Sequence, residues 1–315
     1  MIRMPGRSHA GALEPLTAAE VAYRDELRRH VEHLAVTIGE RHAGRPEALA
    51  KAGEYVAAEL EKLGLAVKRL PYESGGQEFI NYEAEIETEG LGGPVVVIGA
   101  HYDSAIGTPG ANDNATGVAG LLVMAKMATD KGVWPGGPQA NVRFVAFANE
   151  EPPHFQTPAM GSLVYAQRCR QAGDRVTAML SLETIGYFRD ESGSQSYPFP
   201  MSAFYPSTGN FIAFVGDTSS RDLVRQLVRS FRDQTKFPSE GAALPGAIPG
   251  VGWSDHWSFW QHGYPAVMVT DTAPFRYPHY HEPTDAPDEV DYDRLARVVV
   301  GLFRLLDEMV DYPIR

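Results

Sequence analysis

Apolar residues recur at helical spacing in four parts of the chain, and short apolar runs lie between them. A capping box at Thr17–Glu20 precedes the first helical repeat, and Pro46 opens the second one. Later repeats cover Leu223–Phe231 and Leu295–Leu306, which predicts two further helices. The chain is therefore expected to alternate helices with strands.

Five short runs are almost wholly apolar, which is typical of parallel strands that helices cover on both faces. These runs are Val95–Ile98, Val142–Phe147, Ala178–Leu182, Phe211–Val215 and Pro265–Val269. Between residues 80 and 86, by contrast, apolar and polar residues alternate, which indicates a strand with one wet face near an edge of the sheet. We expect an α/β fold, a three-layer αβα sandwich around a central, mostly parallel mixed sheet.

With 315 residues and 43% hydrophobic content, the chain can bury a large core as one domain. Residues 15–315 are expected to form this single domain. Residues 1–14 lack periodicity and are rich in glycine, proline and small polar residues, so we expect a flexible tail. Residues 187–210 are long for a plain connection, and we expect them to shape a substrate cleft; a loose surface insertion is the alternative.

Charge narrows the possible partners. The chain has 28 basic and 40 acidic residues and a net charge of -12, which disfavours binding to nucleic acid and to anionic membrane surfaces.

Because no apolar stretch could span a bilayer and the first residues contain no signal-like apolar segment, we expect a cytoplasmic protein. The single cysteine, Cys169, excludes an internal disulfide and a cysteine-ligated metal cluster, and we expect an inert thiol.

Polar residues with metal-binding chemistry follow several of the predicted strands. His101, the pair Glu150 and Glu151, and Glu183 each come at the carboxyl end of an apolar run, where open α/β sheets gather ligand-binding groups. We expect them to converge in one cleft. A histidine after a strand is, taken alone, ordinarily a hydrogen-bonded loop residue. Two glutamates that end a buried strand need a cation, however, which favours a metal site.

Two more candidate ligands lie in loops. Asp113 is part of a Gly-Ala-Asn-Asp-Asn turn, where an aspartate considered alone more often caps the next helix. His281 lies in a loop that prolines fix, and His279 competes with it because residues two apart in an extended segment face the same way. Asp103 follows His101 by two residues and can orient the histidine ring.

Together these residues form an ordered set of motifs. They are His-x-Asp-Ser at 101–104, Gly-Ala-x-Asp at 110–113, Glu-Glu at 150–151 followed by Gly-Ser at 161–162, Glu183, Ser-Asp-His at 254–256, and His281 with Asp285. On these motifs the chain, from about Gly39 to its C-terminus, resembles the co-catalytic zinc metallopeptidase family (clan MH, peptidase family 28). That family includes bacterial leucyl-type aminopeptidases, glutamate carboxypeptidases, glutaminyl cyclases and the transferrin receptor. The His-Glu-x-x-His motif of other zinc peptidases is absent from the sequence.

The resemblance implies a centre with two zinc ions. Asp113 would bridge the ions, His101 and Glu183 would complete one site, and Glu151 and His281 would complete the other. The charges then cancel, because two zinc ions offset three carboxylates and a bridging hydroxide. A single zinc ion is the alternative, since bacterial aminopeptidases usually have aspartate at the position of Glu183.

The resemblance also assigns the catalytic groups. Glu150 would be the general base that acts with the zinc-bound hydroxide, and Asp103 would orient His101. Some relatives stabilise the oxyanion with a tyrosine shortly before Ser-Asp-His, but residues 250–253 contain none. Tyr280 is the expected substitute; packing within an aromatic loop is the alternative interpretation of this residue.

These roles imply a zinc-dependent aminopeptidase or small-peptide exopeptidase that acts on a peptide or aminoacyl substrate. The first alternative is a glutaminyl cyclase-type aminoacyltransferase, but in that branch a tryptophan typically stands where this chain has Tyr280. The second is a non-catalytic binding protein on the same scaffold, which is disfavoured because all five ligands and the base are present. Neither side-chain preference nor oligomeric state follows from the sequence.

Overall fold

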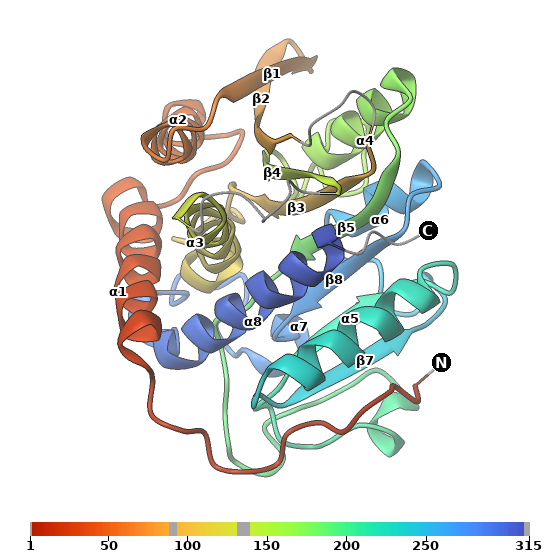
Figure 1. The fold of residues 1–315 in the computed structure, drawn as a ribbon. Coiled ribbons are helices and arrows are strands. Elements are labelled where there is room, and N and C mark those ends of the chain that lie inside the picture. Colours follow the sequence, from red (N-terminus) through yellow and green to blue (C-terminus); the bar gives the residue numbers. More distant parts are fainter. Residues whose placement is uncertain (1, 88–92, 131–138, 312–315) are drawn as a thin grey trace.

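Each predicted apolar run contributes to a strand of one eight-stranded sheet in the computed structural model, which describes residues 2–87, 93–130 and 139–311 (Figure 1). The strands are β1 (Val67–Ser74), β2 (Gln77–Ile86), β3 (Val95–His101), β4 (Asn141–Phe147), β5 (Val176–Leu182), β6 (Ile212–Gly216), β7 (Ser239–Ala243) and β8 (Ala266–Thr270). All five predicted apolar strands and the alternating strand are therefore present.

The strands lie in the order β1-β2-β4-β3-β5-β8-β6-β7. Parallel pairs join β3 to β4 and to β5, β5 to β8, and β6 to β7. The pairs β1/β2, β2/β4 and β6/β8 are antiparallel. The sheet is thus mixed and mostly parallel, as predicted, and β4, β3 and β5 lie side by side near its middle.

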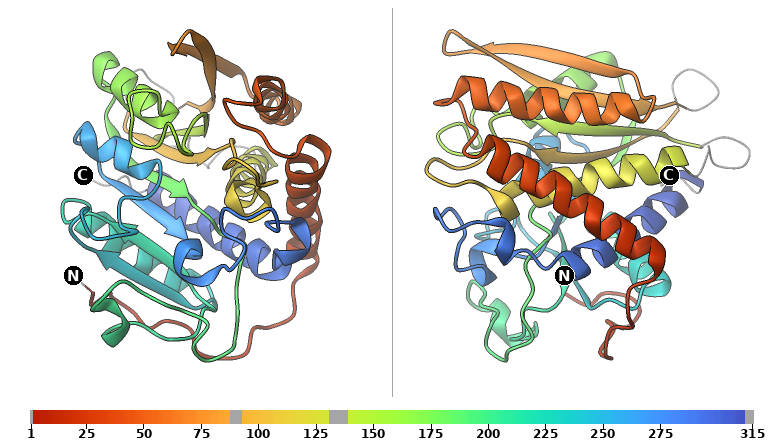
Figure 2. Two further views of the ribbon diagram at one scale, coloured as in Figure 1. Left: turned by 180° about the vertical axis from the view of Figure 1, so that it is seen from behind. Right: turned by 90° about the vertical axis from the view of Figure 1, so that its left-hand side faces the viewer.

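Helices cover both faces of this sheet (Figures 1 and 2). They are α1 (Ala18–Glu32), α2 (Pro46–Lys62), α3 (Gly117–Asp130), α4 (Gly161–Ala172), α5 (Arg221–Gln234), α6 (His256–Gln261), α7 (Ala273–Arg276) and α8 (Tyr292–Asp311). Shorter helical turns lie at His33–Ile38, Ala111–Thr116, Met201–Ala203 and Pro287–Glu289. The αβα sandwich predicted from the apolar runs is confirmed.

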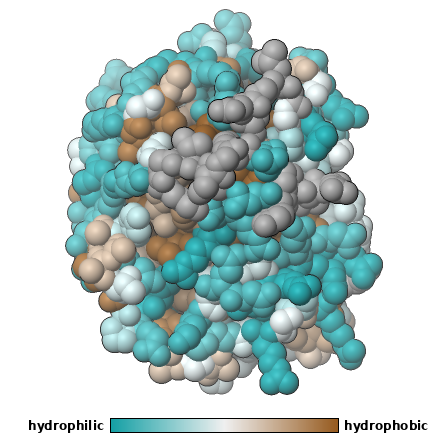
Figure 3. Space-filling model, in the orientation of Figure 1, coloured by the Kyte–Doolittle hydropathy of each residue, from teal (hydrophilic) through white to brown (hydrophobic). Residues whose placement is uncertain are grey.

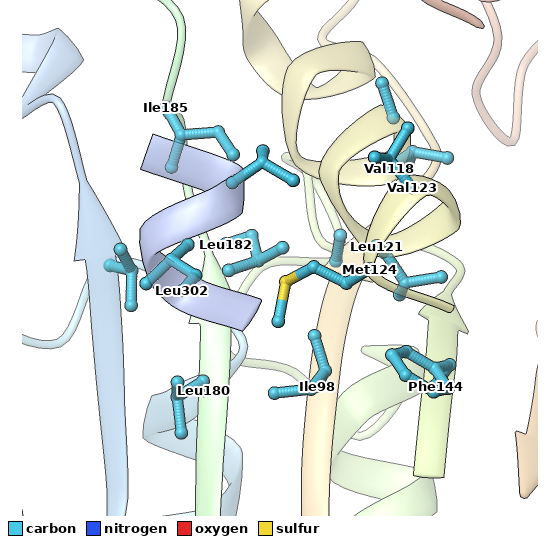
Figure 4. Close-up of a cluster of buried hydrophobic side chains, with 14 of the residues drawn as sticks. Ile98, Val118, Leu121, Val123, Met124, Phe144, Leu180, Leu182, Ile185 and Leu302 are labelled. Carbon is cyan, nitrogen blue, oxygen red and sulfur yellow. The ribbon is translucent and has the colours of Figure 1, made fainter. Parts of the chain in front are cut away.

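Alternate side chains of the central strands enter two different apolar cores, because successive side chains of a strand point to opposite faces. In β3, Val96 and Ile98 join the larger core with α1, α2, α3, α5 and α8. Val95 and Val97 join the smaller core with α4 and α6. Figure 4 shows the middle of the larger core, where side chains of α3 and α8 pack on those of β3 and β5.

Two predicted helix starts are confirmed. The Thr17 hydroxyl accepts a hydrogen bond from the Glu20 backbone N–H at 3.3 Å, and the Glu20 carboxylate accepts one from the Thr17 N–H at 2.7 Å. This reciprocal capping box begins α1. Pro46 is the first residue of α2, where its missing N–H leaves no helical bond unmade.

The two edge strands, β1 and β7, have no counterpart among the predicted strands. β1 is mostly polar and exposed, and β7 has the sequence Ser-Glu-Gly-Ala-Ala, so neither shows the apolar run of a strand covered on both faces. β2 carries the predicted alternating pattern and lies next to the edge, with β1 outside it.

The first residues run along α5 and β7 without regular secondary structure (Figure 1). Arg225 donates to the Arg3 carbonyl at 2.8 Å, Arg232 donates to the Pro5 carbonyl at 3.0 Å, and the Ser8 hydroxyl accepts from the Ser239 N–H at 2.9 Å. These contacts show where the segment lies, whereas its flexibility stays a prediction.

The helical face of the protein is largely polar, and its single cysteine is buried. Hydrophilic side chains cover most of the helical face in Figure 3. Among the described residues, none of the helices combines the length and the apolar character needed to cross a membrane. Cys169 is buried on α4, and burial raises the pKa of its thiol to about 12, which disfavours the reactive thiolate.

Candidate metal centre

The carboxyl ends of three adjacent strands bring four predicted site residues together. His101 is the last residue of β3, Glu150 and Glu151 follow β4 closely, and Glu183 comes directly after β5. All four side chains are buried. Because β4, β3 and β5 are neighbours in parallel, these ends meet at one edge of the sheet, as predicted.

Asp113 reaches the same place from the turn Ala111–Thr116, before α3. One carboxylate fixes this turn: Asp285 accepts hydrogen bonds from the backbone N–H groups of Asn112 at 2.8 Å and Asp113 at 3.1 Å. The Tyr277 hydroxyl donates to the same carboxylate at 2.7 Å. The Asp285 predicted from the motif therefore positions Asp113 through the backbone.

A glycine is required where this turn begins. Gly110 has φ +64°, the left-handed region that side chains rarely adopt. A Cβ atom there would also lie 2.5 Å from the Asp113 carbonyl oxygen. A side chain at this position would therefore displace the residue that the centre shares.

Asp113 lies between two groups of candidate ligands. Its Oδ1 is 3.4 Å from His101 Nε2, which is 2.9 Å from Glu183 Oε2. Its Oδ2 is 3.1 Å from His281 Nε2, which is 3.2 Å from Glu151 Oε2. In each group of three residues, the candidate ligand atoms lie within 4.8 Å of one another. The two oxygens of one carboxylate thus face two different groups of candidate ligands.

Several buried atoms of this cluster are of the kinds that bind metal ions. Among the described residues, both ring nitrogens of His101, both carboxylate oxygens of Asp113 and Oε1 of Glu151 are buried and form no hydrogen bond, although some of these atoms lie within ion-pair distance of one another. A buried polar atom that is left without a partner lowers the stability of the folded protein by about 1–3 kcal/mol. Several such atoms in one cluster are therefore strongly destabilising. Imidazole nitrogens and carboxylate oxygens are ligands that zinc prefers. The donor set therefore fits the zinc ions that the resemblance implies.

When no cation is present, burial favours the protonated form of two carboxyls in this cluster. Burial, reinforced by the charge of Asp113, raises the pKa of Glu151 to about 7 and that of Glu183 to about 8. Burial alone would lower the pKa of His281, but its contacts with Asp113 and Glu151 raise it to about 10. Metal binding would displace protons from these groups.

Asp103 connects the two sides of the centre. Its Oδ1 lies 3.4 Å from His101 Nδ1 and accepts the backbone N–H of Glu150 at 3.1 Å. Its Oδ2 accepts the N–H of Glu151 at 3.0 Å. A single carboxylate thus contacts the ring of one candidate ligand and holds the backbone of another.

Glu150 points into the cluster without belonging to either group that contains Asp113. Its Oε2 lies 3.9 Å from His101 Nε2. Burial and the charges of Glu183 and Glu151 raise its pKa well above the usual range. This environment suits a carboxylate that exchanges a proton during a reaction.

Tyr280 packs beside the centre and lines one pocket with Glu183. Its ring stacks on His281 with 3.9 Å between centroids, and it packs against the buried rings of Tyr187 and Tyr277. Burial and the nearby carboxylates raise the pKa of its hydroxyl well above the usual value. The competing histidine, His279, lies elsewhere, because its ring contacts Thr284 at 2.7 Å and Glu289 at 3.4 Å.

An apolar pocket opens beside Glu183 and Tyr280. Its wall combines aromatic and aliphatic side chains from distant parts of the chain, among them Tyr197, Met201, Tyr205, Phe211, Trp253 and Phe275. The segment 187–210 contributes several of these residues. The pocket can accept an apolar substituent next to the metal ligands.

Two further polar residues that support the centre, Arg41 and Asp271, were not predicted from the sequence. Arg41 is fully buried and donates to the carbonyls of Tyr102 at 2.7 Å, Pro109 at 2.6 Å and Gly110 at 2.9 Å. Asp271 is also buried and accepts from the Asn112 side chain at 3.0 Å. An isolated arginine in a polar stretch resembles an ordinary surface residue, so no local pattern indicated this role.

Comparison with known proteins gives one family and two informative relatives. A family model described as Peptidase family M28 matches residues 81–305, a range that contains the whole centre. Uncharacterized protein YfbL of Escherichia coli strain K12 is 38% identical over 291 residues, which cover 90% of this chain and 87% of that protein. Leucine aminopeptidase 1 of Arthroderma otae is 25% identical over 238 residues, and the match covers 71% of this chain but 57% of that protein.

Solved structures share the fold. BSAP, a zinc aminopeptidase from Bacillus subtilis, superposes with a TM-score of 0.72 and 16% identity, covering 93% of this chain and 96% of that one. Structures of glutaminyl cyclases are similar as well. At these identities the likeness shows the fold alone. The family model, however, spans well over half of the sequence, and the match to YfbL covers most of both proteins. The chain belongs to peptidase family M28.

Proposed function

We propose that this protein is a zinc-dependent aminopeptidase that removes the N-terminal residue of peptides. One observation carries the proposal: the two oxygens of Asp113 face two groups of ligands, with Glu150 beside them. Membership of peptidase family M28 supports the same chemistry. The leucine aminopeptidase and zinc aminopeptidase named above support a hydrolase acting at a peptide N-terminus.

Two zinc ions would share Asp113. His101 and Glu183 would hold one ion, and Glu151 and His281 would hold the other. Zinc at these positions supplies a lowered water pKa and polarisation of the substrate carbonyl. Asp103 keeps the ring of His101 and the backbone of Glu151 in place for this role.

Glu150 moves the proton. Its carboxylate takes a proton from the attacking water and delivers it to the nitrogen of the leaving amine. Its buried position beside the centre fits both steps, because little solvent water can reach the carboxylate and take the proton away. The hydrogen bond from the Glu150 N–H to Asp103 fixes the backbone that aims this side chain.

The apolar pocket receives the side chain of the N-terminal residue. It adjoins Glu183 and Tyr280, so a substrate with its carbonyl at the centre can extend its first side chain into it. Tyr280 also has a hydroxyl near the carboxylate cluster and donates to the oxyanion of the tetrahedral intermediate.

We predict that the protein hydrolyses aminoacyl p-nitroanilides with apolar side chains and that a zinc chelator abolishes this activity. Added zinc should restore it, because the ligands are protein side chains that remain in place. Release of p-nitroaniline measures the rate. Absence of hydrolysis by zinc-loaded protein, with cyclisation of peptides that begin with glutamine, would instead favour the cyclase.

Replacement of Glu150 by glutamine should lower kcat by about 100-fold to 10,000-fold while zinc binding is retained, because the amide cannot accept the proton. Zinc content by mass spectrometry and p-nitroanilide turnover test this together. Glu61→Gln, which changes an exposed glutamate of α2, is the matched control and should keep full turnover. Full activity of the Glu150 variant would remove this residue from its role as base.

Chelation should also lower the melting temperature, since an ion that binds only the native protein adds to its stability. Thermal unfolding followed by circular dichroism, before and after removal of zinc, measures the effect. Magnesium should not reverse the shift, because it prefers oxygen ligands to imidazole. Identical melting curves with and without chelator would contradict a metal bound by these carboxylates.

A further inference from the structure

A second pocket reaches the centre from the side of Glu151. It is lined by Asp103, Ile106, Asn149, Glu151, Pro153 and His154, among others. The apolar pocket, by contrast, reaches the centre at Glu183 and Tyr280. These two pockets therefore adjoin different ligand groups, one on each side of Asp113.

The backbone at His154 is held in a tight turn. Its N–H donates to the Glu151 carbonyl at 2.9 Å, and its own carbonyl accepts from the N–H and the hydroxyl of Thr157 at 3.0 Å and 2.6 Å. This turn ties the position of His154 to a candidate metal ligand. The residue therefore keeps a fixed place beside the centre.

The His154 ring is available to a ligand. It lies edge-on to Phe79, with 5.8 Å between centroids, and its nitrogens form no hydrogen bond or ion pair with the described residues. His42, which lines the same pocket, differs: its Nε2 is 2.9 Å from Glu40, and its Nδ1 accepts the Gly44 N–H at 3.0 Å. His154 is thus the histidine of this pocket with an unused N–H.

Asn149 offers the complementary group. Its side-chain amide N–H donates to the Tyr72 hydroxyl at 3.2 Å, whereas its Oδ1 is buried and accepts no hydrogen bond from the described residues. A buried acceptor without a partner is costly, and an N–H of a ligand would satisfy it. The pocket therefore presents one acceptor and one donor, which match the N–H and C=O of a peptide backbone.

We propose that this pocket binds the residue on the leaving side of the cleaved bond, with His154 donating a hydrogen bond to the carbonyl oxygen of that residue. The inference rests on the proposed function. If the first side chain occupies the apolar pocket, the rest of the peptide leaves the centre on the Glu151 side, where His154 lies. The substrates are then true peptides, and an anilide leaving group lacks the carbonyl that His154 contacts.

The test compares two substrates that share the first residue. Leucine p-nitroanilide has no carbonyl on its leaving side, whereas Leu-Gly-Gly has one. His154→Ala should lower the ratio of kcat/KM for the peptide to kcat/KM for the anilide at least tenfold, mainly through a higher KM. His154→Gln keeps an N–H donor and should recover most of the ratio.

A matched control separates this role from general damage. His262 precedes β8, at the opposite end of the strands from the centre, and His262→Ala should leave the ratio unchanged. Zinc content should be the same in all three variants. An equal loss on both substrates, or no change in the ratio, would overturn the leaving-side pocket while anilide hydrolysis by the unmodified protein still supports the proposed function. Hydrolysis of neither substrate by that protein would overturn both.

Discussion

Several carboxylates that are buried side by side are the constraint on which this structure depends. Asp113, Glu150, Glu151 and Glu183 face one another at the end of the sheet with little access to water. Without a cation, burial raises the pKa of Glu151 to about 7 and that of Glu183 to about 8, which favours protonation of these two carboxyls. Two divalent ions would replace those protons and satisfy the buried atoms that lack partners.

The fold meets this constraint by fixing the ligands through the backbone. The order β4-β3-β5 puts three strand ends next to one another, so sheet hydrogen bonds set the spacing of His101, Glu151 and Glu183. Two further carboxylates hold loops rather than metal: Asp103 binds the N–H groups of residues 150 and 151, and Asp285 binds those of residues 112 and 113. Carboxylates thus serve both as candidate metal ligands and as the groups that hold the ligand-bearing loops in place.

Sequence patterns predicted the parts of this site that strong local signals mark. Apolar strands located the ends where His101 and Glu183 lie, and ordered motifs identified Asp113 and His281. The edge strands β1 and β7 were missed, because neither contains the continuous run of apolar residues that marks a strand covered by helices on both faces. Arg41 was missed too, since its partners are carbonyls near residues 102–110 that only the folded chain brings within reach. The leaving-side role proposed for His154 likewise depends on which ring nitrogens remain unpaired among the described residues.

We propose that Asp113 is shared between two zinc ions. The most direct test is the zinc content per chain, measured by inductively coupled plasma mass spectrometry after loading with zinc and dialysis against metal-free buffer. We expect close to two zinc ions per chain, and a marked loss of zinc in an Asp113→Ala variant that remains folded. A value near zero would contradict the metal centre, and a value near one would contradict the bridging role of Asp113.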